Sequence, residues 1–94
     1  MTEAEKLTIL KNDLQLRTDG NDTFLGFLLE GAKVLIKQEG IILVENDTNC
    51  DMVQIHYAAY LFRRRGGEET SMPRFLRYEL NNLLFSQKGA ANDI

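Results

Sequence analysis

Apolar residues recur at the spacing of a helix in four segments of this chain, and short polar stretches rich in Gly, Asp and Asn separate them. The first segment, residues 3–15, follows Thr2, which stands three residues before Glu5 as in a helix-capping box. The second begins after the turn at residues 19–22, runs to about Glu39 and stops at Gly40, and glycine is typical of the position just after a helix. Both segments are therefore predicted to be helices.

The third segment, residues 50–65, is apolar on more than one side, which is typical of a helix with neighbours all round it. Gly66 and Gly67 are expected to end it. Pro73 then opens the fourth segment, since proline suits the first position of a helix, and a leucine stripe follows. Together the segments predict one all-α domain over residues 1–88, a compact bundle of about four short helices around a central helix.

The connections between these helices carry residues typical of caps and turns. Asp19 or Asp22 is expected to cap the second helix, because a carboxylate accepts from the unpaired N–H groups of a first turn. Residues 41–44 form a β-branched apolar run too short for a helix, so they are either a short strand or an extended linker that fills the core. Residues 89–94 are expected to be a flexible tail. The third helix is expected to take its cap from Asp47, Thr48 or Asn49.

The size of the chain limits its core. A chain of 94 residues buries only about 60–65% of its unfolded surface, so a few apolar side chains must hold the bundle together. The helical stripes predict that these are Leu25, Leu28, Ala32, Leu35, Ile55, Ala59, Phe62, Leu76, Leu80 and Leu83.

Charge is distributed unevenly, although the chain carries a formal charge of only −3. Residues 1–60 hold ten acidic and five basic side chains, whereas residues 61–94 hold six basic and four acidic ones. Neutralisation of phosphates drives nucleic-acid binding, so an acidic chain is a poor general binder of DNA or RNA. The basic end can still meet an acidic partner locally.

The chain has few side chains suited to catalysis. His56 is the single histidine and Cys50 the single cysteine, and they stand too far apart for the close ligand pairs of structural zinc sites. We therefore predict no enzyme activity, no cofactor and no metal, with His56 structural or interfacial and Cys50 a small buried or half-buried residue. A lone cysteine fits a reducing compartment, and the N-terminal residues lack the pattern of a signal peptide, so we expect a cytoplasmic protein without a membrane span.

Arginines concentrate around the break between the third and fourth segments. Arg63, Arg64 and Arg65 are either a solvated helix end, where cations complement the helix dipole by ~0.3–1 kcal/mol, or a docking patch. Arginine forms bidentate pairs with carboxylates, so it suits a protein interface. The docking patch would also include Arg74 and Arg77 of the fourth segment.

A second candidate interface lies on the second segment. Phe27, Gly31 and Val34 fall on one line of that helix, beside its main leucine stripe. Glycine within a helix costs ~0.8–1 kcal/mol relative to alanine, and it permits the close approach of another backbone. The approaching segment is either another helix of the same chain or a neighbouring subunit.

Residues 57–88 carry a resemblance to a known family. They read YAAYLFRRR at 57–65, MPR at 72–74, LNN at 80–82 and LFSQK at 84–88. Through these short motifs the segment resembles the C-terminal helix pair of the small α-helical head–tail connector proteins of tailed bacteriophages, also called head-completion adaptors. The resemblance implies a mostly α-helical subunit whose helices pack around one long central helix.

The resemblance also implies a function in the virion of a phage or prophage. Such an adaptor binds below the portal ring after DNA packaging, forms a ring of identical subunits around the DNA channel, and offers a surface to the next head-completion or tail protein. DNA would pass through the ring without sequence-specific binding. Two alternatives stay open: a small helical nucleic-acid-binding module that uses the Arg63–Arg77 surface, and a helical regulator or toxin–antitoxin partner.

Overall fold

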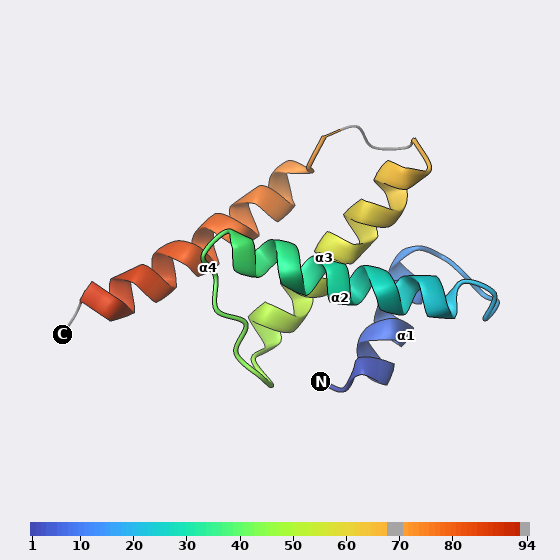
Figure 1. Ribbon diagram of the computed structural model, residues 1–94, viewed down its shortest axis with the longest axis horizontal. Coiled ribbons are helices and arrows are strands. Elements are labelled where there is room, and N and C mark those ends of the chain that lie inside the picture. Colours follow the sequence, from blue (N-terminus) through green and yellow to red (C-terminus); the bar gives the residue numbers. More distant parts are fainter. Residues whose placement is uncertain (68–70, 93–94) are drawn as a thin grey trace.

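The computed structural model describes residues 1–67 and 71–92, and within them the fold is all-α without a strand (Figure 1). The helices, in chain order, are α1 (Glu3–Asp13), α2 (Asp22–Gln38), α3 (Thr48–Arg65) and α4 (Arg74–Asn92). Figure 1 shows α2 crossing α3, with α1 and α4 on different sides of α3. Because α3 packs against each of the other three helices, the prediction of a bundle around a central helix is confirmed.

The predicted core is largely confirmed. Leu35, Phe62 and Leu83 are only partly buried and pack against the core, because each lies at the margin of the buried face of its helix. Leu10 of α1 and Ile41, just after α2, are also buried. The other predicted core residues are buried as expected: Leu25, Leu28, Ala32, Ile55, Ala59, Leu76 and Leu80.

The start of α1 forms as predicted, whereas the start of α2 does not. Thr2 and Glu5 make both hydrogen bonds of the capping box. The N-cap of α2 is Asn21, which makes no side-chain cap bond, so the expectation that Asp19 or Asp22 caps this helix was wrong. The Nζ atom of Lys11 lies 2.8 Å from the Asp19 carboxylate and 2.9 Å from the Asp22 carboxylate, and these contacts raise the pKa of Lys11. The end of α1 is thereby tied to the start of α2.

Helix α3 begins and ends as the sequence indicates. The side chain of Asp47 accepts from the backbone N–H of Cys50 at 3.1 Å and is the N-cap. At the other end Gly66 is the C-cap, and Gly67 follows with a φ of 79°. Glycine adopts this left-handed conformation without the steric cost that other residues meet, so the second glycine of the pair allows the chain to leave the helix.

The connection after α2 is an extended linker and not a strand of a sheet. Ile41 fills the core, while Ile42 is 68% exposed. The side-chain amide of Gln87, on α4, accepts from the Ile42 N–H at 2.9 Å and donates to the Ile42 carbonyl at 2.7 Å. The backbone N–H of Val44 donates to the Sγ atom of Cys50 at 3.4 Å. Side chains therefore satisfy backbone groups of the linker that a neighbouring strand would otherwise pair with.

Helix α4 is longer than predicted. Pro73 directly precedes its first residue, and the Pro73 carbonyl accepts from the N–H of Arg77 at 3.1 Å. The helix continues to Asn92, so the helical domain does not stop at residue 88, and only residues 93–94 of the expected tail lie outside the described residues. In Figure 1 the last turns of α4 extend past the end of α2.

Candidate functional site

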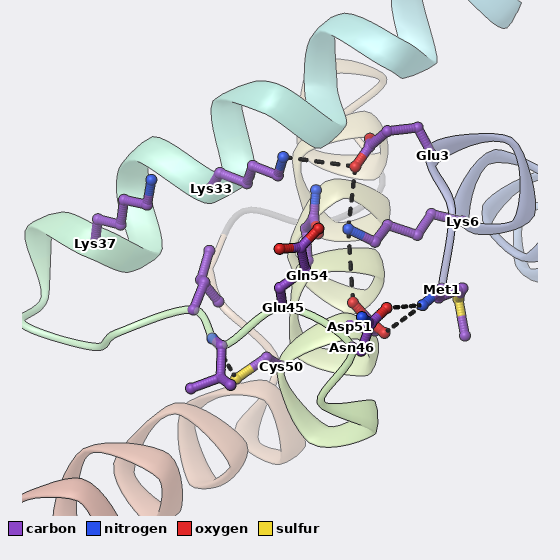
Figure 2. A pocket seen from close by; sticks show the side chains of 12 residues that line it. Met1, Glu3, Lys6, Lys33, Lys37, Glu45, Asn46, Cys50, Asp51 and Gln54 are labelled. Carbon is purple, nitrogen blue, oxygen red and sulfur yellow. Dashed lines mark hydrogen bonds and ion pairs between the residues drawn. The ribbon is translucent and has the colours of Figure 1, made fainter.

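A pocket of about 250 Å³ lies where the start of α1, the middle of α2, the linker and the start of α3 meet (Figure 2). Its walls carry charges of both signs. Lys33 and Lys37 come from α2, Glu3 from α1, Glu45 from the linker and Asp51 from α3. This mixture of charges makes the pocket a polar concavity in which charges from α1, α2, the linker and α3 come together.

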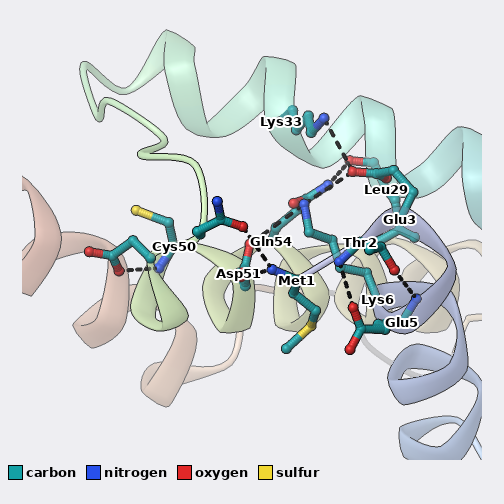
Figure 3. A network of polar contacts seen from close by, with 12 residues as sticks. Met1, Thr2, Glu3, Glu5, Lys6, Leu29, Lys33, Cys50, Asp51 and Gln54 are labelled. Atoms are coloured by element: carbon teal, nitrogen blue, oxygen red, sulfur yellow. Dashed lines mark hydrogen bonds and ion pairs between the residues drawn. The ribbon is translucent and has the colours of Figure 1, made fainter.

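An alternating chain of charges crosses the inner wall of this pocket (Figure 3). The Nζ atom of Lys6 lies 3.1 Å from Glu3 Oε1 and 3.5 Å from Asp51 Oδ1. Lys33 Nζ lies 3.5 Å from the same Glu3 oxygen, and the amino group of Met1 lies 3.5 Å from Asp51 Oδ2. Lys6 and Asp51 are buried, so the link between α1 and α3 faces little water. The link to α2 runs through Glu3 and Lys33, whose side chains are 55% and 29% exposed.

The protonation states of Glu3 and Lys33, the more exposed residues of this chain of charges, follow from these contacts. Partial burial acts to raise the pKa of the Glu3 carboxyl, but the ammonium groups of Lys6 and Lys33 outweigh it and hold that pKa below its usual value. Burial likewise acts to lower the pKa of Lys33, and the carboxylates of Glu3 and Glu30 outweigh it and raise that pKa. Both side chains stay charged near neutral pH, which keeps the network ionic.

This network is built to link helices. Lys6, Lys33 and the Met1 amino group each lie beside a carboxylate, and Gln54, buried at the same wall, donates through Nε2 to the backbone carbonyl of Leu29 at 3.0 Å. We did not predict the network from the sequence. A signal was present, because Lys6 stands one helical turn before buried Leu10, and Asp51 one turn before buried Ile55. A charged residue on the apolar face of a helix needs a partner of opposite charge.

Cys50 lines the same pocket and is 3% exposed, which confirms the expectation of a buried thiol. Burial raises the pKa of this thiol, and the nearby carboxylates of Asp47 and Asp51 raise it further. A thiol with a raised pKa and little exposure is unreactive, because the thiolate is the nucleophile.

We expect a thiol-specific dye at pH 8 to label Cys50 of the folded protein far more slowly than Cys50 of the urea-unfolded protein. Equal labelling rates would contradict this burial.

The five candidate arginines do not form one patch. Arg63 points to the end of α1, where its guanidinium lies 3.3 Å from Asp13 Oδ2. Arg65 lies over the ring of Phe24, at the start of α2, with 4.7 Å between the guanidinium carbon and the ring centre. Arg77 instead pairs with Glu39, just after the other end of α2. Seventeen residues of helix, about 25 Å, separate these two ends of α2.

The charges of Arg64 and Arg77 both act on the hydroxyl of Tyr57, on α3. Burial raises the pKa of the Tyr57 hydroxyl, Glu39 raises it further, and the charges of Arg64 and Arg77 partly offset both effects. Three successive arginines at the end of a helix point about 100° apart, so they cannot all face one partner. Arg64 and Arg74 are exposed, and in the part of the chain that the structure describes neither takes part in an ion pair.

The candidate surface on α2 is open to solvent. Phe27 is 71% exposed and Val34 is 55% exposed. A Cβ atom built on Gly31, or on Gly26 one turn earlier, would have nothing within 4 Å apart from its own helix. Among the described residues no other helix of this chain approaches these glycines, so close packing of a second helix of the same chain does not explain them.

His56 joins α3 to α4. Its Nδ1 atom lies 2.8 Å from Glu79 Oε1, and its ring meets the edge of Phe75 with 5.3 Å between ring centres. These contacts agree with the predicted structural or interfacial role of His56.

Within residues 1–67 and 71–92, His, Cys, Asp and Glu side chains nowhere gather in a group of three that could hold a metal ion.

Comparison of the chain with protein-family models, with curated proteins and with solved structures found no match. None of the helices in the described part of the chain is both long and apolar enough to cross a membrane.

Proposed function

We propose that this chain is a head–tail connector subunit of a tailed bacteriophage, which binds below the portal ring and contributes to a ring around the DNA channel during head completion. The observation that carries the proposal is the sequence of residues 57–88, which belongs to α3 and α4 and resembles the C-terminal helix pair of that family. The all-α fold around a central α3 supports it, since the resemblance implies that architecture.

Two open surfaces give the proposed subunit places to meet its neighbours. The face of α2 with Phe27, Gly31 and Val34 is apolar and uncovered, which suits contact with the next subunit. Arg64 and Arg74 are exposed cations that suit acidic groups on a portal or tail protein. The net charge of −3 suits a protein that lets DNA pass, because basic walls would hold the phosphates.

We expect the double substitution Arg64→Ser and Arg74→Ser to impair the joining of tails to DNA-filled heads. In a complementation assay the yield of infectious particles should fall at least about tenfold, the effect of ~1.4 kcal/mol of lost docking energy. Arg63 and Arg65 are left intact, because their contacts with Asp13 and Phe24 belong to the fold. The matched control, Arg17→Ser with Lys88→Ser, removes the same charge from other exposed positions.

The outcomes separate the proposal from its rivals. A double variant that yields infectious particles at the level of the control would show that these two arginines have no docking role. Purified wild-type chain that fails to bind DNA-filled heads lacking it would overturn the connector function itself. If the wild type shows a tight, salt-sensitive affinity for DNA that the double variant loses, the chain is a nucleic-acid-binding module instead.

A further inference from the structure

The outer face of α4 carries a row of exposed aromatic side chains. Phe75 is 50% exposed, Tyr78 is 60% exposed and Phe85 is 68% exposed. The opposite face of the same helix holds Leu76 and Leu80, which are fully buried against the rest of the fold. Helix α4 is therefore apolar on two sides. The described residues of this chain cover the first side fully and touch the outer row at Phe75, whose ring meets His56 of α3.

The spacing of this outer row is that of a coiled-coil seam. Phe75, Tyr78, Asn82 and Phe85 follow one another at steps of three, four and three residues. In the heptad notation Phe75 and Asn82 take position a, and Tyr78 and Phe85 take position d. Asn82 is exposed, and an asparagine at a single a position is the residue that fixes register between paired helices.

We propose that α4 pairs with α4 of a second copy of this chain, parallel and in register, along Phe75, Tyr78, Asn82 and Phe85. In this arrangement Asn82 meets its own counterpart, so the two side-chain amides can hydrogen-bond to each other. The contact is two-fold symmetric, and such a contact cannot by itself extend into a ring. It is a property of the free chain and does not rest on the proposed function.

The charges beside the seam favour the parallel arrangement. Arg74 takes position g and Glu79 the following position e, and parallel pairing brings these two positions of different copies together. Glu79 Oε1 contacts His56, and a carboxylate can accept at its second oxygen as well. Antiparallel pairing would instead bring Arg74 opposite Lys88, where two cations repel each other.

The area of the seam sets the strength of the pairing. With ~200 Å² for each aromatic side chain, the exposed fractions of the three rings correspond to about 350 Å² per copy. Two copies therefore bury about 700 Å² through these rings, below the ~1,200 Å² at which stable interfaces begin. The pair is consequently a weak dimer, and its population depends on concentration.

Sedimentation of the purified chain from about 10 µM to about 1 mM tests the pairing, since weak contacts fall in this range. We expect the average mass to rise from monomer toward dimer. Phe85→Glu should keep the chain monomeric with an unchanged circular-dichroism spectrum, because the side chain is exposed. A wild type that stays monomeric throughout, or a Phe85→Glu variant that still dimerises, would overturn the proposal.

Cross-linking tests the direction of the pairing. In a parallel, in-register pair the two copies of position 82 face each other, so Asn82→Cys should be joined rapidly into dimers by a short bifunctional maleimide. Asn12→Cys, at an exposed site on α1, is the matched control, and buried Cys50 is common to both variants. Cross-linking of Asn82→Cys no faster than the control, in a wild type that does dimerise, would overturn the parallel arrangement.

Discussion

Replacing Leu80 with alanine is expected to lower the free energy of unfolding by about 2–5 kcal/mol. Leu80 is fully buried, and α4 is fastened to the rest of the fold mainly through its contacts with α3. Deleting the side chain both removes apolar burial and leaves a cavity in a core that this short chain cannot readily refill. For a domain of this size the melting temperature should fall by at least about 8 °C.

Two variants on the same helix control this result. Leu83 is only partly buried, so Leu83→Ala should cost less than Leu80→Ala. Asn82 is exposed, and Asn82→Ala should change the free energy of unfolding by no more than about 0.5 kcal/mol. If all three variants melt within a degree of the wild type, the face of α4 that packs on α3 has been assigned wrongly.

Lys6→Met is the second substitution from which we expect a large effect, a loss of about 3–5 kcal/mol of folding free energy. The change removes the Lys6 ammonium group, 3.5 Å from Asp51 Oδ1, and leaves the buried Asp51 carboxylate with the Met1 amino group, 3.5 Å from its other oxygen. Removing one partner of a buried ion pair costs more than removing both, because the remaining charge is kept from water. The double variant Lys6→Met with Asp51→Leu should therefore regain much of the lost stability.

Chemical denaturation of the single and double variants gives the coupling energy of the pair. Lys33→Met is the matched control, because its ammonium group contacts the same Glu3 carboxylate from a side chain that is 29% exposed. Partly solvated pairs contribute about 0–1 kcal/mol. An equal loss in Lys6→Met and Lys33→Met would contradict a special role of the buried pair, and so would a double variant less stable than either single one.

The helices could be predicted because their signals are local. The Thr2–Glu5 capping box, Gly40 after α2 and Pro73 before α4 each act within a few residues, and each lies where the sequence places it. The cap of α2 was missed because Lys11 competes for Asp19 from another helix. Such competition depends on how α1 and α2 approach each other, which local rules do not encode.

The candidate surfaces were predicted less completely. Sequence adjacency suggested that Arg63, Arg64 and Arg65 act together, but Arg63 contacts α1, Arg65 contacts α2, and Arg64 is exposed. The exposed row of Phe75, Tyr78 and Phe85 was missed for a related reason. The leucines of α4 already supply a face for the core, and only the packed structure shows that the aromatic residues lie outside it.

The hydrogen bonds between Gln87 and Ile42 connect two segments that are 45 residues apart. Because one side-chain amide serves both backbone groups of Ile42, the last turns of α4 cannot fray past Gln87 without breaking the hydrogen bonds that hold the linker between α2 and α3. Local opening of either segment therefore promotes opening of the other, and the two behave as one cooperative unit beneath the stability of the whole fold.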